Sequence, residues 1–220
     1  MFINVNNVDL FYEKSGSGPG LVLLHGNSED HHVFDRLVAK LANHFTIYAL
    51  DSRDHGQSQM TGAYSYEAMA EDLSGFIEAL KLAPVNIVGF SDGAIQGLLL
   101  ALNKPQAVKK LALLGGNLSP DDFTEEAVAY LREVEKDLSS PVFSMIFTEP
   151  HIELETLKNI KAPCLVVYGE NDLFKPELPQ AIAQTIPKAS LLVLKGHDHL
   201  SYIVDNDLMY EDLWDFFMGA

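Results

Sequence analysis

Length, composition and charge already exclude several classes of protein. The chain has 220 residues, of which 47% are apolar and 21% charged, as expected for one soluble domain or a core with a small insertion. Its 31 acidic residues against 15 basic ones give a formal net charge of -16, a field that repels nucleic acids and anionic membrane surfaces. We therefore expect neither nucleic acid nor membrane as a partner.

The first residues carry no targeting signal that we can identify. The segment MFINVNNVDLFYEK lacks a basic stretch followed by an apolar one, and the apolar runs further along are far shorter than a membrane span. A cytoplasmic location is the expectation.

In chain order, the first elements expected are two short strands within residues 2–13. They alternate apolar and polar residues and are broken at Asn6 and Asn7, which predicts a β-hairpin. Short continuous apolar runs follow, typical of strands buried on both faces of a parallel sheet. These runs cover residues 21–25, 45–51, 85–90, 110–115, 163–169 and 190–195.

Helical patterns or polar loops separate these runs. Ser65 precedes an amphipathic pattern and predicts a capped helix, while Asp92 begins a nearly all-apolar pattern that predicts a buried helix. Alternating strands and helices build a doubly wound, mostly parallel sheet, here of eight strands with helices on both faces.

One segment departs from this alternation. Residues 118–160 are polar and acidic, with helical patches, and lie between two expected strands. The sequence thus predicts a core of residues 1–117 and 161–220 with a small helical cap insertion at residues 118–160.

The chemistry begins at GFSDG, residues 89–93, between an expected strand and an expected helix. This G-x-S-x-G pattern needs glycine at both ends because a sharp strand-to-helix turn leaves no room for side chains there. Such a turn exposes the Ser91 hydroxyl beside a helix N-terminus, where developing negative charge is favoured. Ser91 is therefore the candidate nucleophile.

Four further motifs occur in the same chain order as in a known family. They are HGN at 25–27, DSRDHGQS at 51–58, GEND at 169–172 and GH at 196–197. Together with GFSDG they resemble the α/β-hydrolase fold family over nearly the whole chain outside residues 118–160. The resemblance implies a serine hydrolase whose oxyanion hole is formed by the backbone N–H groups of Asn27 and Asp92.

The same resemblance implies the other two catalytic residues. Asp172, preferred over Glu170, follows an expected strand and would orient the base. For the base we choose His197, because Gly196 before it matches the family's GH pair at the point where the chain is expected to leave the sheet. His199, just before an amphipathic helical pattern, is the alternative, with a capping or loop-packing role as its simpler interpretation.

Two residues are candidates for substrate binding. The carboxylate of Asp92 could pair with a cationic group, such as the ammonium of an amino-acid ester, although an acidic residue at a helix N-terminus is already favoured by the helix dipole. His25, in the HGN motif, is the second candidate.

Some residues differ from the family pattern. Asp54 stands where the usual loop has glycine, and we expect the loop to form because aspartate tolerates a left-handed conformation. Serine at position 91 disfavours haloalkane dehalogenase chemistry, which needs aspartate there. The HGGPG pattern of proline iminopeptidases is absent.

No metal or cofactor is expected. His31, His32, His151, His197 and His199 could supply imidazoles, but the sequence contains no H-E-x-x-H motif and no phosphate-binding glycine loop.

The expected function is hydrolysis of small carboxylic esters, aminoacyl ones included, or thioesters through an acyl-enzyme, with a small molecule as partner. A carbon-carbon bond hydrolase and a receptor-like binding protein with a slow triad are the alternatives. The sequence does not indicate the oligomeric state.

Overall fold

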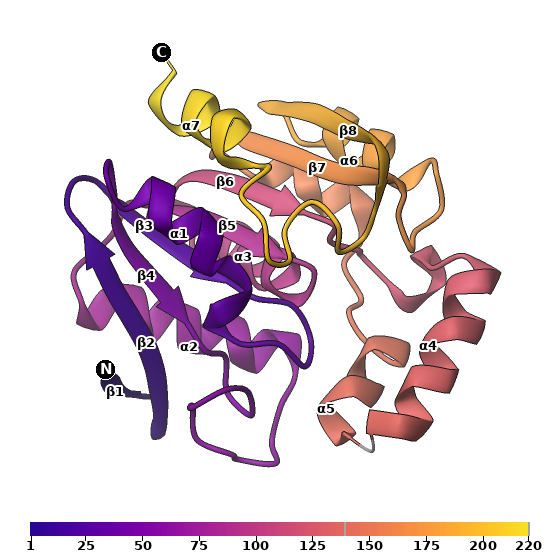
Figure 1. The fold of residues 1–220 in the computed structure, drawn as a ribbon, viewed down its shortest axis with the longest axis horizontal. Coiled ribbons are helices and arrows are strands. Elements are labelled where there is room, and N and C mark those ends of the chain that lie inside the picture. The colour runs from indigo at the N-terminus through magenta and orange to yellow at the C-terminus, as the bar shows by residue number, and fades with distance from the viewer. Residues whose placement is uncertain (139, 220) are drawn as a thin grey trace.

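The computed structural model describes residues 1–138 and 140–219, so residue 139 of the expected insertion and residue 220 of the expected core lie outside the described residues. The chain forms the expected eight-stranded sheet, in the order β1-β2-β4-β3-β5-β6-β7-β8 (Figure 1). Strands β1, β2 and β4 pair antiparallel and all other neighbours pair parallel. The predicted fold class is thereby confirmed.

The strand bounds follow the apolar runs closely, with one exception at the end of the chain. The strands are β1 Phe2–Val5, β2 Val8–Gly16, β3 Gly20–Leu24, β4 Thr46–Leu50, β5 Val85–Phe90, β6 Val108–Leu114, β7 Cys164–Asn171 and β8 Ala189–Asp198. Strand β8 continues past the apolar run at residues 190–195, and this difference matters for the site.

Helices cover both faces of the sheet (Figure 1). Helices α1 (Asp35–Leu41) and α7 (Tyr210–Met218) pack on one face, whereas α2 (Tyr66–Ala79), α3 (Asp92–Asn103) and α6 (Leu178–Thr185) pack on the other. Strand β3 illustrates why its sequence is apolar throughout. Successive side chains point to opposite faces, so Leu23 contacts the first helix layer and Leu24 the second.

Local signals in the sequence account for two of these elements. Asn6 and Asn7 have φ values of 51° and 63°, which the tight hairpin turn between β1 and β2 requires and which asparagine tolerates well. Ser65 caps α2 by accepting a hydrogen bond from the backbone N–H of Ala68 at 3.1 Å.

The segment between β6 and β7 contains helices α4 (Glu125–Leu138) and α5 (Pro141–Ser144). Figure 1 shows both helices together on the right, apart from the helices that cover the sheet. Leu131 of α4 is buried and the opposite face of the helix is exposed. The limits of the insertion, 118 and 160, stay a prediction. Within the described ranges, every helix is too short or too polar to cross a membrane.

Candidate active site

Ser91 lies at the sharp turn between β5 and α3. The strand is buried along its whole length, and the helix begins at the next residue. Ser91 itself has φ 51° and ψ -113°, an uncommon conformation for a residue with a side chain, and its backbone N–H donates to the carbonyl oxygen of Leu114 at 2.8 Å. The neighbouring strand thus helps to hold the strained turn.

The two glycines of the motif are required by close backbone contacts. A Cβ on Gly89 would lie 2.2 Å from the carbonyl oxygen of Gly93, and a Cβ on Gly93 would lie 2.2 Å from the carbonyl oxygen of Leu24. Neither contact is with a flexible side chain that could move aside. The spacing of the motif therefore reflects the packing of α3 against β3 and β5.

Ser91, His199 and Asp172 form a continuous hydrogen-bonded chain. The Oγ of Ser91 lies 3.1 Å from Nε2 of His199, and Nδ1 of His199 lies 2.7 Å from Oδ1 of Asp172. Their positions correspond to a nucleophile, a base and an orienting carboxylate.

The expectation that His197 approaches Ser91 is wrong. Its Nδ1 instead lies 3.1 Å from Oγ of Ser201, at the surface. The reason is that β8 does not end at Gly196: this glycine has φ 77°, yet the strand continues to Asp198, which pairs with Asn171 of β7. The first residue beyond the strand is consequently His199.

Asp172 is fixed from several sides. Oδ2 accepts the backbone N–H of Gly169 at 3.1 Å, and Oδ1 accepts that of Leu173 at 2.8 Å in addition to the histidine. Its side chain is only 4% exposed. The alternative carboxylate, Glu170, accepts the backbone N–H of Gly196 at 2.8 Å and takes no part in the chain.

Apolar rings hold the imidazole of His199 in place. Its centroid lies 5.1 Å from that of Phe90 and 5.5 Å from that of Phe174. Gly115 approaches so closely that a Cβ there would lie 2.8 Å from Cε1 of the imidazole. This packing restricts the ring to an orientation in which it can reach both partners.

The loop after β3 lies directly beside Ser91. A Cβ on Gly26 would lie 3.2 Å from Cβ of Ser91. Asn27 is the next residue along the chain and therefore also lies close to Ser91. Among the described residues, the backbone N–H groups of Asn27 and Asp92 donate to no other group. That they form an oxyanion hole stays a prediction.

The carboxylate of Asp92 is already bound within the protein. It is 3% exposed, with Oδ1 accepting the hydroxyl of Tyr66 at 2.7 Å and Oδ2 accepting the side-chain amide of Asn27 at 2.9 Å. Burial raises its pKa above the usual range, although both hydrogen bonds oppose this shift. The geometry favours a structural role in fixing Asn27 over contact with substrate.

His25 is not brought to the cavity described below. It is 1% exposed; its Nδ1 donates to the carbonyl oxygen of Gly26 at 2.7 Å, and its Nε2 accepts the backbone N–H of Ser52 at 3.0 Å. Burial and the neighbouring His55 lower the pKa of His25 to about 4. Its role here is to join the loops after β3 and β4, which corrects the expectation of substrate contact.

Asp54 takes the left-handed conformation expected for it, with φ 62°. Its Oδ1 accepts the backbone N–H groups of Thr61 at 2.6 Å and Gly62 at 2.8 Å. The aspartate thus replaces glycine and also orders the following loop.

A cavity of about 400 Å³ opens over Ser91 and His199. Its walls are mostly apolar and come from the loops after the strands, from α4, which contributes Leu131 and Val134, and from α5, which contributes Phe143. This volume falls toward the lower end of the range for small-molecule sites.

Glu29 is a cavity residue that the sequence did not single out. Its side chain is partly buried, lines the cavity and accepts the backbone N–H of Gly26 through Oε2 at 2.9 Å. Burial, aided by the carboxylates of Asp92 and Asp30, raises its pKa to about 7. The only signal in the sequence is that Glu29 lies shortly after the HG pair. Ser28 and Asp30 lie equally near, so this position does not single out Glu29.

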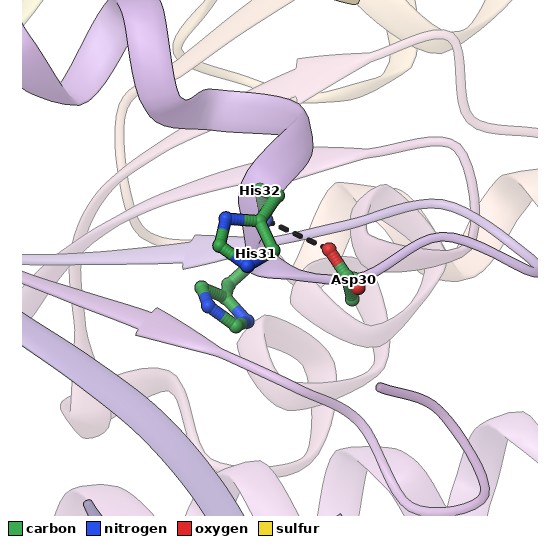
Figure 2. A group of neighbouring side chains, drawn as sticks. All are labelled: Asp30, His31 and His32. Carbon is green, nitrogen blue, oxygen red and sulfur yellow. Dashed lines mark hydrogen bonds between the residues drawn. The ribbon is translucent and has the colours of Figure 1, made fainter. Parts of the chain in front are cut away.

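Asp30, His31 and His32 lie close enough to suggest a metal site, with one candidate ligand atom each within 4.8 Å of the others (Figure 2). These groups have other partners: Asp30 accepts the backbone N–H of His32 at 2.9 Å, and Nδ1 of His31 lies 2.8 Å from Asp51. The two imidazole centroids lie 4.1 Å apart with the planes tilted by 35°, and Nδ1 of His32 lies 3.0 Å from Oδ2 of Asp35. The cluster caps a helical turn, and we assign no metal to it.

Comparison with known proteins agrees with this geometry. A family model described as "alpha/beta hydrolase fold" matches residues 19–143. The chain is 35% identical over 118 residues to a fluoroacetate dehalogenase from Burkholderia sp, a match that covers 51% of this chain and 39% of the dehalogenase. The chain therefore spans well under two thirds of that relative's length.

Two solved structures show the same fold over nearly the full chain. Est816, described as an N-acyl homoserine lactone degrading enzyme, has a TM-score of 0.86 and 23% identity and covers 98% of this chain and 100% of its own. The enol-lactonase from Burkholderia xenovorans LB400 has a TM-score of 0.83 and 24% identity and covers 99% and 100%. With its sheet order, its strand-turn-helix at Ser91 and the family match over more than half of its length, the chain belongs to the α/β-hydrolase fold family.

Proposed function

We propose that the protein is a serine hydrolase that cleaves small carboxylic esters, lactones or thioesters through an acyl-enzyme at Ser91. The observation that carries the proposal is the chain from Ser91 Oγ to His199 Nε2 at 3.1 Å and from His199 Nδ1 to Asp172 Oδ1 at 2.7 Å, with Ser91 and His199 lining the cavity. In this proposal, His199 takes the role that the sequence had suggested for His197.

In the first half-reaction, Ser91 Oγ attacks the carbonyl carbon while Nε2 of His199 takes the hydroxyl proton. Asp172 stabilises the resulting imidazolium and keeps Nδ1 protonated. The tetrahedral intermediate then collapses: the bond to the leaving alcohol or thiol breaks, His199 returns the proton to it, and the acyl group stays on Ser91.

In the second half-reaction, water replaces the alcohol. His199 takes a proton from the water, whose oxygen attacks the acyl carbon, and returns it to Ser91 Oγ as the carboxylic acid leaves. The backbone N–H groups of Asn27 and Asp92 would stabilise the negative oxygen in both steps, each contributing about 3 kcal/mol by the usual effect of one such donor. The hydrogen bond between the side chains of Asn27 and Asp92 supports this role because it fixes both residues beside Ser91.

The residues at the site favour an ester over a haloalkane substrate. Although a dehalogenase is among the relatives, dehalogenation through an alkyl ester needs an aspartate nucleophile, and position 91 is serine. The enol-lactonase and the N-acyl homoserine lactone degrading enzyme share the fold, and a lactone is a cyclic ester that the same steps would open. The apolar cavity of about 400 Å³ suits a small acyl group.

The experiment is a panel of nitrophenyl acetate, nitrophenyl butyrate, a butyryl thioester and a butyrolactone, assayed with the protein and with Ser91→Ala. We expect sustained turnover of at least one ester and a decrease of at least about a thousandfold in the variant, whose fold should persist because the turn depends on its glycines. A single burst without turnover would indicate a binding protein instead. Ser91→Ala retaining a tenth of the activity would refute the mechanism.

A further inference from the structure

Three carboxylates line the cavity above Ser91, and within the described part of the chain no lysine or arginine does. They belong to Glu29, Asp92 and Asp198. Since the whole chain carries a formal charge of -16, no distant excess of positive charge offsets them. A substrate that brings a negative charge into this cavity is therefore disfavoured, and one that brings a positive charge is favoured.

Glu29 differs from the other two in position and in its hydrogen bonds. Asp92 has both oxygens bound by Tyr66 and Asn27. Asp198 accepts two backbone N–H groups of its own loop through Oδ1, and its side chain is exposed, whereas Glu29 is partly buried. In Glu29, Oε2 accepts one backbone N–H, and Oε1 accepts none among the residues that the structure describes. An oxygen with spare accepting capacity is thus present in the cavity wall.

This carboxylate is also close to the reacting atoms. A Cβ on Gly26 would lie 2.8 Å from Oε2 of Glu29 and 3.2 Å from Cβ of Ser91. Oε2 and the nucleophile's Cβ are therefore no further apart than the sum of these two distances. A cation bound to Glu29 would therefore lie close to the scissile carbonyl of a substrate at Ser91.

We propose, on the basis of the serine hydrolase function above, that Glu29 is a specificity-determining residue that binds an ammonium group close to the scissile bond of the substrate. The ammonium and the Glu29 carboxylate would form an ion pair at a partly buried site, where the attraction between opposite charges is stronger than at the surface. The ammonium would also donate a hydrogen bond to Oε1 of Glu29, which accepts none among the described residues. The role that the sequence had suggested for the Asp92 carboxylate would then belong to Glu29.

The raised pKa of Glu29 is consistent with this role. A carboxylate that has lost hydration without gaining a positive partner holds its proton more tightly, and here the pKa rises to about 7. The groups that act on it are His199, Asp92 and Asp30, together with the N–H of Gly26. A bound ammonium would supply the missing positive charge and favour the ionised form.

The test uses three nitrophenyl esters with two methylenes each: β-alanyl, butyryl and succinyl, which end in an ammonium, a methyl and a carboxylate. For the wild type we expect kcat/KM to decrease in that order. In Glu29→Gln, which can still accept the N–H of Gly26, the ratio of β-alanyl to butyryl should fall about tenfold, as for a partly buried charge pair, and the ratio of succinyl to butyryl should rise.

A second pair of substrates places the charge on the alcohol side: 2-(dimethylamino)ethyl butyrate and its uncharged isostere 3-methylbutyl butyrate. The pair whose ratio responds to Glu29→Gln shows on which side of the scissile bond the ammonium lies. Asp30→Asn is the matched control. It removes the same charge one residue away, outside the cavity lining, and retains the helix cap, so both ratios should stay within about twofold.

Failure of this inference is separable from failure of the proposed function. Turnover of the butyryl ester and its loss in Ser91→Ala test the function alone. If butyryl turnover depends on Ser91 while Glu29→Gln leaves the charge ratios of both series unchanged, Glu29 does not select substrates and the inference is overturned. The same holds if Asp30→Asn changes the ratios as much as Glu29→Gln.

Discussion

Replacing each of the two neighbouring histidines separates the structural account from the sequence motif. His199 is the hydrogen-bonding partner of Ser91 and Asp172, at 3.1 Å and 2.7 Å. Among the described residues, the His197 side chain makes one hydrogen bond, with Oγ of Ser201 at 3.1 Å. His199→Ala should therefore remove the base and the link to the carboxylate together, whereas His197→Ala should remove one exposed hydrogen bond.

The expected magnitudes differ by orders of magnitude. Loss of the base should lower kcat by about 10⁵-fold, which equals about 7 kcal/mol of transition-state stabilisation. Any rate that remains above the uncatalysed hydrolysis in water would come from substrate binding and from the backbone N–H donors to the oxyanion. His197→Ala should stay within about threefold of the wild type, since an exposed hydrogen bond contributes little.

The assay is steady-state hydrolysis of nitrophenyl butyrate at neutral pH, with circular dichroism and thermal unfolding to establish that each variant is folded. His199→Gln serves as a second variant because it keeps more of the volume that packs against Phe90 and Phe174. If His197→Ala loses activity as severely as either His199 variant, or if His199→Gln retains a tenth of it, the assignment of the base is refuted.

Two further predictions concern stability. Gly93→Ala should lower the free energy of unfolding by more than about 3 kcal/mol, because its Cβ would lie 2.2 Å from the Leu24 carbonyl oxygen. The control is Gly97→Ala, where the nearest atoms to the new Cβ belong to leucine and isoleucine side chains. Equal losses of unfolding free energy for the two variants in urea titrations would contradict the packing argument. The second rests on the pKa of His25, which is lowered to about 4 in the folded state, so the unfolded chain binds the proton first and stability falls as pH decreases from 6.5 toward 4. The cost of His25→Gln should accordingly be about 2 kcal/mol smaller at pH 5 than at pH 7, and a cost independent of pH would show that His25 does not contribute this dependence.

Features that depend on local sequence could be predicted. The GFSDG turn needs two glycines next to each other in space, and those contacts impose a fixed spacing in the chain. Asp54 could be assigned a left-handed conformation from its residue type and its place in the loop, and it has φ 62°. The order of strands and helices likewise followed from short apolar runs alternating with helical patterns.

The histidine that contacts Ser91 could not be chosen correctly because the end of a strand depends on its neighbour. His197 and His199 are two residues apart and so share one face of an extended chain, which makes the alternation of side chains uninformative. The end of β8 is set by pairing with β7 as far as Asn171 and Asp198, across an irregular register. Gly196 looked like the end of the strand but bends the chain within it.

The cavity residues were hidden for a similar reason. Whether Glu29 or Asp30 faces the nucleophile depends on how the loop after β3 folds, and the sequence shows only two adjacent acidic residues. Tyr66 is far from Asp92 in sequence, yet it binds the carboxylate that had seemed available to a substrate. Contacts between distant segments decide both cases.

The most direct test of the central claim is detection of the acyl group on Ser91. The protein would be mixed with nitrophenyl butyrate, quenched in acid within the first turnover, digested and examined by mass spectrometry. We predict a butyryl adduct on the peptide that contains Ser91, at up to one per chain, absent from Ser91→Ala and accumulating at most slowly in His199→Ala. Turnover without an adduct at Ser91, or an adduct at another residue with the same kinetics, would contradict the account.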